Sequence, residues 1–202
     1  MDAFGWKAGF RTPFIFFGLV IPALAITIAA ESAHAGLILD SSLLYYSTTV
    51  PGSTTDTVGK TFGGFSVSGT IDKAFHVGWT LDVTNFSDNP GSGATTLSGM
   101  EMGPRFGVYF GKSRALELAV AWLASSNGTY AAAGGSAESW SGMGFQGELG
   151  YAPEITEIVH VGFKLVYAMN LYSKKTDSAN TTSNVSYTRT DILPTLYISL
   201  RY

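Results

Sequence analysis

The carboxy-terminal stretch Tyr187–Tyr202 alternates between two kinds of residue with a period of two. From Ile192 onward its even-numbered residues are apolar, and the chain stops on the aromatic Tyr202. The residues between them are mostly charged or hydroxylated: Arg189, Asp191, Leu193, Thr195, Tyr197, Ser199 and Arg201. Successive residues of a strand point to opposite faces, so this period predicts a β-strand with one apolar and one polar face. The apolar face must contact a protein core or lipid, and the alternation alone does not decide which.

Seven earlier segments repeat the pattern. In residues 75–86, for example, Phe75, Val77 and Trp79 alternate with His76 and Gly78. Helical spacing fits none of these segments, so we predict an all-β chain. The eight expected strands are about 37–47, 60–70, 75–86, 100–110, 116–122, 143–151, 159–171 and 187–202.

Short and long connections alternate between the predicted strands. The short ones, 71–73, 111–114 and 152–156, carry the Gly, Pro, Asp or Ser residues of tight turns. The long ones are rich in Ser, Thr, Gly and Asn, and they span 48–59, 87–98, 125–139 and 174–186. Strictly alternating loop lengths predict an antiparallel up-and-down sheet with the long loops at one end and both termini at the other.

The distribution of charge favours a membrane barrel over a soluble fold. In the last six segments every charged residue falls on the face opposite the large apolar residues: Asp82, Glu101, Arg105, Glu117, Glu148, Lys164, Arg189, Asp191 and Arg201. Lipid-exposed charge costs about 2 to 4 kcal/mol near the bilayer midplane, so a barrel must keep it inside. A soluble sandwich or lipocalin-like barrel would load that face with Lys and Glu, whereas here Gly, Ala, Ser and Thr accompany the charges. Small residues suit the narrow interior of an eight-stranded transmembrane β-barrel, which is the fold we predict.

The amino terminus has the features of an export signal. Lys7 and Arg11 precede an uncharged run over residues 14–30, and Ala33-His34-Ala35 supplies the small residues that a signal peptidase accepts. We therefore expect a signal peptide over residues 1–35 and one barrel domain over 36–202. An uncleaved helical anchor is the alternative, because the run just reaches the length of a membrane-spanning helix.

Composition excludes several classes of protein. The formal net charge is −3, and the segment 1–35 carries two acids and two bases, so cleavage leaves the charge unchanged. This charge gives no basic footprint for nucleic acid. The chain contains no cysteine, which excludes a disulfide scaffold, a thiolate metal site and an acylated amino-terminal cysteine.

The signal, the eight alternating segments, the loop pattern and the ending Leu196-Tyr197-Ile198-Ser199-Leu200-Arg201-Tyr202 resemble the small eight-stranded outer-membrane barrels of Gram-negative bacteria, the group that includes OmpA transmembrane domains and OmpW. The resemblance covers the whole mature chain. It implies residence in outer-membrane lipid, export by the Sec translocon, periplasmic chaperoning and insertion by the barrel-assembly machinery, which in this family reads the terminal strand. We expect Leu196, Ile198, Leu200 and Tyr202 to form that insertion signal. The resemblance is specific for architecture and weak for function, since such barrels serve as anchors, adhesins, channels and lipid-modifying enzymes.

The candidate functional residues are the charged and polar side chains expected inside the barrel. The inward charges alternate in sign on neighbouring strands, so they form either a gate for small solutes or a structural network that neutralises charge in a narrow lumen. By residue type alone, a catalytic set could include His76, Asp82 and His160. The sequence contains no Gly-x-Ser-x-Gly elbow and no metal-spaced histidine pair to accompany them. We therefore expect no enzyme activity, no metal and no cofactor.

The first choice for function is a structural or surface-interacting outer-membrane barrel with a narrow, charge-plugged lumen. A channel for small solutes or hydrophobic compounds is the alternative, and an enzyme acting on lipid has less support. The sequence identifies no surface partner.

Processing is directly testable. Because Ala33 and Ala35 precede the expected cut, mature protein should begin at Gly36. Intact-mass analysis of membrane-extracted protein measures this, and a mass that still includes residues 1–35 would support the uncleaved anchor instead.

Overall fold

The computed structural model describes residues 36–72, 74–89 and 94–202, apart from 50–56. The described chain forms eight strands: β1 (Leu37–Thr49), β2 (Thr57–Thr70), β3 (Phe75–Asn89), β4 (Thr95–Phe110), β5 (Leu116–Ala131), β6 (Glu138–Tyr151), β7 (Val159–Thr176) and β8 (Thr182–Arg201). None of the described residues belongs to a helix long and apolar enough to span a membrane. The predicted all-β fold with eight strands is confirmed.

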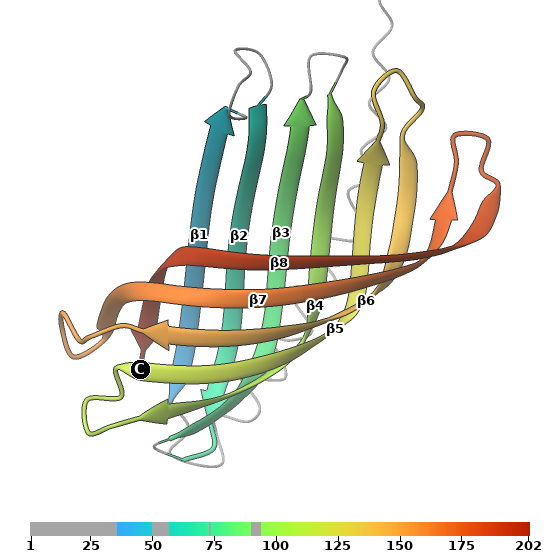
Figure 1. Ribbon diagram of the computed structural model, residues 1–202. Helices are drawn as coiled ribbons and strands as arrows, with labels where there is room; N and C mark the ends of the chain where they lie inside the picture. The colour runs from blue at the N-terminus through green and yellow to red at the C-terminus, as the bar shows by residue number, and fades with distance from the viewer. Residues whose placement is uncertain (1–35, 50–56, 73, 90–93) are drawn as a thin grey trace, which may run out of the picture.

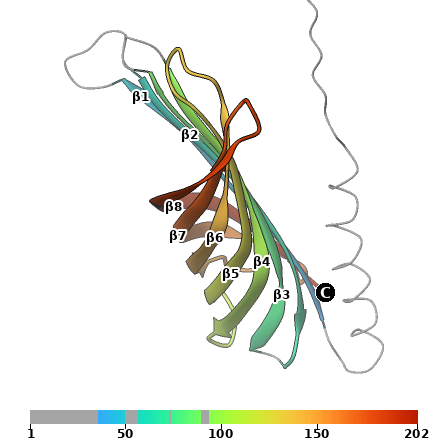
Figure 2. The same cartoon turned by 90° about the vertical axis from the view of Figure 1, so that its right-hand side faces the viewer.

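The strands pair antiparallel in chain order, and β1 pairs with β8 to close a barrel (Figure 1). The hairpins β1–β2, β3–β4, β5–β6 and β7–β8 gather at one end, as Figures 1 and 2 show. At the other end the backbone N–H of Tyr202 donates to the carbonyl of Leu37, so the carboxy terminus lies beside the start of β1. The up-and-down topology is therefore the one that the loop pattern predicts.

Side chains alternate between the interior and the exterior along the strands. Phe163 on β7 is 68% exposed, whereas its neighbour Lys164 is 3% exposed. Large apolar residues such as Trp122, Leu196 and Ile198 point outward on β5 and β8, while Arg105 on β4 is fully buried. The predicted faces of the strands are confirmed.

The strands extend further toward the hairpin end than the sequence predicts. Residues 125–131 and 138–139 were expected in a loop but belong to β5 and β6, and the expected loop 174–186 is reduced to residues 177–181. The polar composition of these stretches is typical of loops. Backbone pairing in a hairpin, however, requires no apolar face, so residues such as Asn127 and Thr129 continue the ladder where their side chains are exposed.

Glycine allows the wall to bend at two register shifts. One shift lies between Met102 and Arg105 in β4, and a Cβ on Gly103 would overlap the carbonyl oxygen of Trp122. The other lies between Ser141 and Gly142 in β6, where a Cβ would overlap the carbonyl oxygen of Leu171. Close backbone approach at such irregularities lets a strand curve around a narrow barrel.

The seam between β1 and β8 is short. Their ladder runs only from Ile38 opposite Arg201 to Leu43 opposite Leu196, although both strands continue toward the hairpin end. In Figure 1, β8 crosses in front of β1 near the middle of β1 and then runs away from it across the other strands.

Pro194 gives a local reason why the ladder stops. The N–H of Tyr202 points toward β1, and that of Arg201 points away to the carbonyl of Ile158. Backbone N–H groups alternate in direction along a strand, so even-numbered residues of β8 face β1. Pro194 is the next such position above Leu196, and proline has no N–H to donate.

Substitution of Pro194 tests this explanation. If the register of the seam continued, Tyr45 would lie opposite residue 194, so in Pro194→Ala the new N–H should donate to the carbonyl of Tyr45 and extend the seam. Amide hydrogen exchange of the refolded barrel measures this, and we expect slow exchange at residue 194. Fast exchange there would show that the divergence of the two strands, rather than the missing donor, ends the pairing.

Candidate functional site: the charged interior

Arg105 stands at the centre of the lumen and contacts carboxylates from three other strands. Its Nη1 lies 3.1 Å from Oδ2 of Asp40 on β1, and its Nη2 lies 2.5 Å from Oε1 of Glu117 on β5. Its Nε and Nη2 donate to the two oxygens of Glu148 on β6 at 3.0 and 2.8 Å. A planar guanidinium and a carboxylate fit each other in this bidentate geometry, which makes the Arg105–Glu148 pair the best-defined contact of the network.

Lys164 on β7 is the second cation of this centre. Its Nζ lies 2.7 Å from Glu148 Oε2, 3.6 Å from Glu117 Oε2, and 3.9 Å from the ring centroid of Tyr197 on β8. The Tyr197 hydroxyl in turn lies 2.7 Å from Glu117 Oε2. The two cations therefore share carboxylates, so each charge is compensated by more than one partner.

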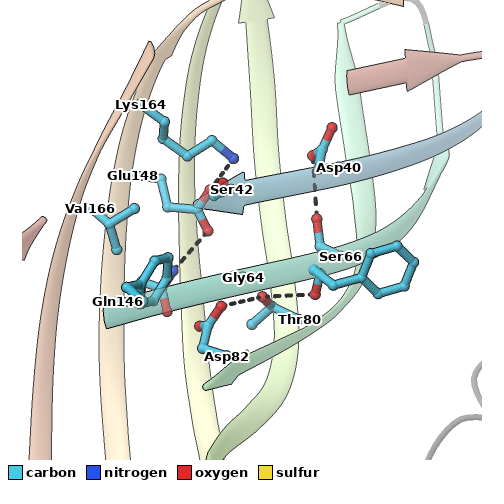
Figure 3. Close-up of a pocket in the computed structure, with 12 residues that line it drawn as sticks. Asp40, Ser42, Gly64, Ser66, Thr80, Asp82, Gln146, Glu148, Lys164 and Val166 are labelled. Atoms are coloured by element: carbon cyan, nitrogen blue, oxygen red, sulfur yellow. Dashed lines mark hydrogen bonds and ion pairs between the residues drawn. The ribbon is translucent and has the colours of Figure 1, made fainter. Parts of the chain in front are cut away.

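Every strand contributes a polar side chain to this network. β2 adds Ser66, whose hydroxyl donates to Asp40 at 3.3 Å, and β3 adds His76, whose Nε2 lies 3.1 Å from Glu117. Figure 3 shows how side chains from neighbouring strands converge here, with Gln146 and Lys164 both reaching Glu148. The cavity that remains between them is about 10 Å³, roughly the space of one water. Side chains therefore fill most of the lumen at the level of Asp40, Glu148 and Lys164.

A second cluster lies nearer the hairpin end. Lys60 Nζ on β2 lies 2.5 Å from Asp191 Oδ1 on β8, and Arg189 Nε lies 2.6 Å from the other Asp191 oxygen. An apolar group consisting of Leu44, Phe62, Val166 and Leu193 also packs within the barrel. Leu44 and Leu193 lie just above the last β1–β8 pair. Apolar side chains therefore line the interior where the seam ends.

Two of the inward carboxylates form no ion pair among the described residues. Asp82 and Glu101 lie opposite each other on β3 and β4. Glu101 accepts hydrogen bonds from Thr84 and Asn170, both at 3.3 Å, while Oδ2 of Asp82 has no partner among the described atoms. These two acids are inward as predicted from their face, but the contacts place them outside the ion-pair clusters.

The structure thus brings some of the nine expected charges together and separates others. One cluster contains Arg105, Glu117, Glu148 and Lys164, and the other contains Arg189 and Asp191. Arg201 lies at the terminal end, where its guanidinium carbon is 3.9 Å from the centroid of the Tyr109 ring. Sequence reasoning missed Asp40, Lys60 and Tyr197. Asp40 lies in Leu37-Ile38-Leu39-Asp40, where apolar residues on both faces obscure the alternation.

The structure describes the expected insertion residues but not the expected cleavage residues. Leu196, Ile198 and Tyr202 are exposed on the outward face at the end of the chain, and Leu200 is partly exposed there. Ala33 and Ala35 lie outside the described residues, so the cleavage site stays a prediction.

The two histidines have separate surroundings. His76 lies against Glu117 and stacks on Tyr109 with ring centroids 4.8 Å apart, while Nδ1 of His160 lies 3.3 Å from the carbonyl oxygen of Ala152. In the described part of the chain no group of three or more His, Asp or Glu side chains could hold a metal ion.

Aromatic rings line the interior at the hairpin end. Trp140 contacts Tyr130, Tyr172 and Tyr187 with ring centroids 5.0, 5.8 and 5.1 Å apart. Beside them Glu138 accepts hydrogen bonds from Lys175 and from the Trp140 indole, and these two bonds lower the pKa of Glu138 below its ordinary value. The wall of this mouth therefore combines flat apolar faces with an ion pair, whereas ion pairs dominate the contacts at the centre.

Comparison with solved structures finds other small barrels. The chain is similar to Neisserial surface protein A (NspA), with 14% sequence identity, a TM-score of 0.47, and coverage of 84% of this chain and 98% of that chain. It is also similar to the outer membrane protein OprG from Pseudomonas aeruginosa, with 13% identity, a TM-score of 0.47, and coverage of 83% and 95%. No protein-family model and no curated protein sequence matches the chain. By its own strand pairing, the chain has the eight-stranded up-and-down architecture of the small outer-membrane barrels.

Proposed function

We propose that this protein is an integral barrel of the Gram-negative outer membrane with a structural or surface-interaction role and no catalytic role. The observation that carries the proposal is the crowded centre of the lumen. Arg105 is fully buried there among Asp40, Glu117 and Glu148, and the cavity lined by Asp40, Glu148 and Lys164 is only about 10 Å³. Described side chains that fill the centre in this way would block a continuous aqueous path, so the work of the barrel would fall to its outer surface and its hairpins.

The exterior supports placement in lipid. Exposed side chains on the middle of β5, β7 and β8 are apolar, including Trp122 at 50%, Phe163 at 68% and Leu196 at 59% exposure. Exposed apolar surface of this extent is costly in water and favourable in a bilayer. Outer-membrane lipid is accordingly the first partner in the proposal.

Biogenesis follows from the same assignment. The protein would be exported by the Sec translocon, held by periplasmic chaperones and inserted by the barrel-assembly machinery, with Leu196, Ile198, Leu200 and Tyr202 as the segment that the machinery reads. Their outward position at the end of β8 supports this, because a partner could contact them before the barrel closes against β1. The termini then lie on the periplasmic side and the four long hairpins outside the cell.

A hydrophobic-compound channel is the second candidate, favoured by the short seam. Above Leu43 and Leu196 the two strands part, and the apolar residues Leu44 and Leu193 lie inside the barrel beside that point. An apolar solute could pass there from the upper lumen into lipid without crossing the charged centre. If the channel opens at this point, Pro194→Ala should reduce uptake of an apolar dye into liposomes that contain the protein, because the variant should extend the seam.

Orientation in lipid can be tested with a charge on the outer face. Phe163→Arg should destabilise the folded barrel by about 2 to 4 kcal/mol, because Phe163 lies on the outward apolar face of β7, next to the middle residue Leu165 of that face. Equilibrium unfolding from lipid vesicles in guanidinium chloride measures the difference. Thr188→Arg, on the outward face of β8 near the hairpin end, is the matched control and should cost about 1 kcal/mol or less. Equal effects of the two variants would be inconsistent with the membrane placement.

We call the charged cluster of Arg105, Asp40, Glu117, Glu148 and Lys164 the plug. Whether it closes the lumen can be tested by removing its central cation, Arg105. Arg105→Ala leaves Asp40, Glu117 and Glu148 without their shared partner, so it should lower stability, with about 3 to 5 kcal/mol as the upper range for a broken buried pair. The same variant should raise single-channel conductance in planar bilayers, where wild-type barrels conduct poorly.

Lys174→Ala removes an exposed cation at the hairpin end and serves as the control for both measurements. Large, steady wild-type currents that Arg105→Ala leaves unchanged would show an open pore and would reject the plug.

A further inference from the structure

The terminal end of the barrel opens into a cavity of about 550 Å³ that none of the functions above uses. The cavity lies between the three tight turns, the start of β1 and the end of β8. Three cations line it, Lys112, Arg114 and Arg201, and none of them forms an ion pair with a carboxylate in the described part of the chain. The centre and the hairpin end are different, because there each described cation in the clusters has an acidic partner.

Arg201 is held rigidly at the inner wall of this cavity. Its guanidinium carbon lies 3.9 Å from the centroid of the Tyr109 ring, its Nε donates to the Ser199 hydroxyl at 3.0 Å, and its Nη1 donates to the carbonyl of Arg114 at 2.6 Å. The residue is 7% exposed, and its Nη2 has no hydrogen-bond partner among the described atoms. One face of a fixed, buried cation is therefore left without an acceptor.

Arg114 brings a second guanidinium to the same ring. Its guanidinium carbon lies 5.4 Å from the Tyr109 centroid, and its buried Nε also has no partner among the described atoms. Two like charges that share one aromatic ring repel each other, and an anion bound between them would remove that repulsion. The free donors of the two residues match what an oxyanion requires, since guanidinium N–H groups form strong charge-assisted hydrogen bonds to phosphate or carboxylate oxygens.

None of the described acids around the cavity forms an ion pair with Arg201 or Arg114. Glu154 and Glu157 are exposed, and Tyr202, which carries the terminal carboxylate, is also largely exposed. Oδ1 of Asp72 accepts the backbone N–H groups of Ala74 and Phe75, both at 2.7 Å.

We propose that the terminal cavity binds a small oxyanion, a phosphate or a phosphate monoester, through Arg201 and Arg114. The bound group would accept hydrogen bonds from the guanidinium groups of Arg201 and Arg114, which line the cavity and retain the buried donors Nη2 and Nε without a partner among the described atoms. Lys112 would supply further positive charge from the turn between β4 and β5. The same chemistry belongs to a soluble phosphate compound and to the phosphate of a lipid headgroup.

Titration of the refolded full-length barrel in detergent micelles with inorganic phosphate, followed by ³¹P NMR line width and by calorimetry, tests the proposal. We expect saturable binding to the wild type, weakened roughly ten-fold or more in Arg201→Gln and in Arg114→Gln. Arg114 lies in a turn, so Arg114→Gln tests the site without altering the terminal strand. Lys174→Gln removes one exposed cation at the opposite end and should bind phosphate as the wild type does.

A parallel titration with dihexanoyl phosphatidic acid identifies the source of the phosphate. Tighter binding of this lipid than of inorganic phosphate supports a headgroup site, and the reverse order supports a site for a soluble anion. Absence of saturable phosphate binding to the wild type, or an equal loss in Arg114→Gln and Lys174→Gln, would overturn the proposal.

Discussion

The fold depends on neutralising charge inside a tube that is too narrow to hydrate it. Arg105 is fully buried, and it is compensated only when Asp40, Glu117 and Glu148 arrive from β1, β5 and β6. Those carboxylates come from opposite parts of the wall, so they meet only in the closed barrel. A buried cation without partners is strongly unfavourable, whereas this arrangement gives it three. The network consequently couples the short β1–β8 seam to the rest of the sheet from the inside, where backbone pairing alone is sparse.

The outer surface explains why so much of the architecture could be read from the sequence. Lipid tolerates almost no charge, so each strand must sort its residues with a strict period of two, and that period is visible in stretches such as Phe75–Thr84. Beyond the lipid the constraint disappears, and the predicted strand ends were therefore wrong at Ser125–Ala131 and Lys174–Thr176. Hairpin ladders there are stabilised by backbone hydrogen bonds that any polar residue can supply.

The interior was less predictable because its partners lie across the barrel and not along the chain. Alternation placed Arg105, Glu148 and Lys164 on the inner face, but it could not show that Arg105 contacts Asp40, 65 positions earlier in the chain. Nor could it show that Lys60 of β2 reaches Asp191 of β8 while Asp82 and Glu101 lie in no ion pair among the described residues. Strand order gives neighbours in the wall. Contacts across the lumen depend also on strand tilt and on bulges such as the one near Gly103, which sequence periodicity does not encode.

The arrangement of charge along the axis bears on what the two ends can do. An anion held by Arg201 and Arg114 would next meet Tyr109, His76 and then the centre, where three carboxylates face two cations. The excess of negative charge and the filled space both oppose its passage. The terminal cavity is therefore better suited to hold an anion than to admit one for transport. At the other end, Trp140 and its tyrosine neighbours present flat apolar faces beside the Glu138–Lys175 pair, a surface suited to contacts from outside the barrel.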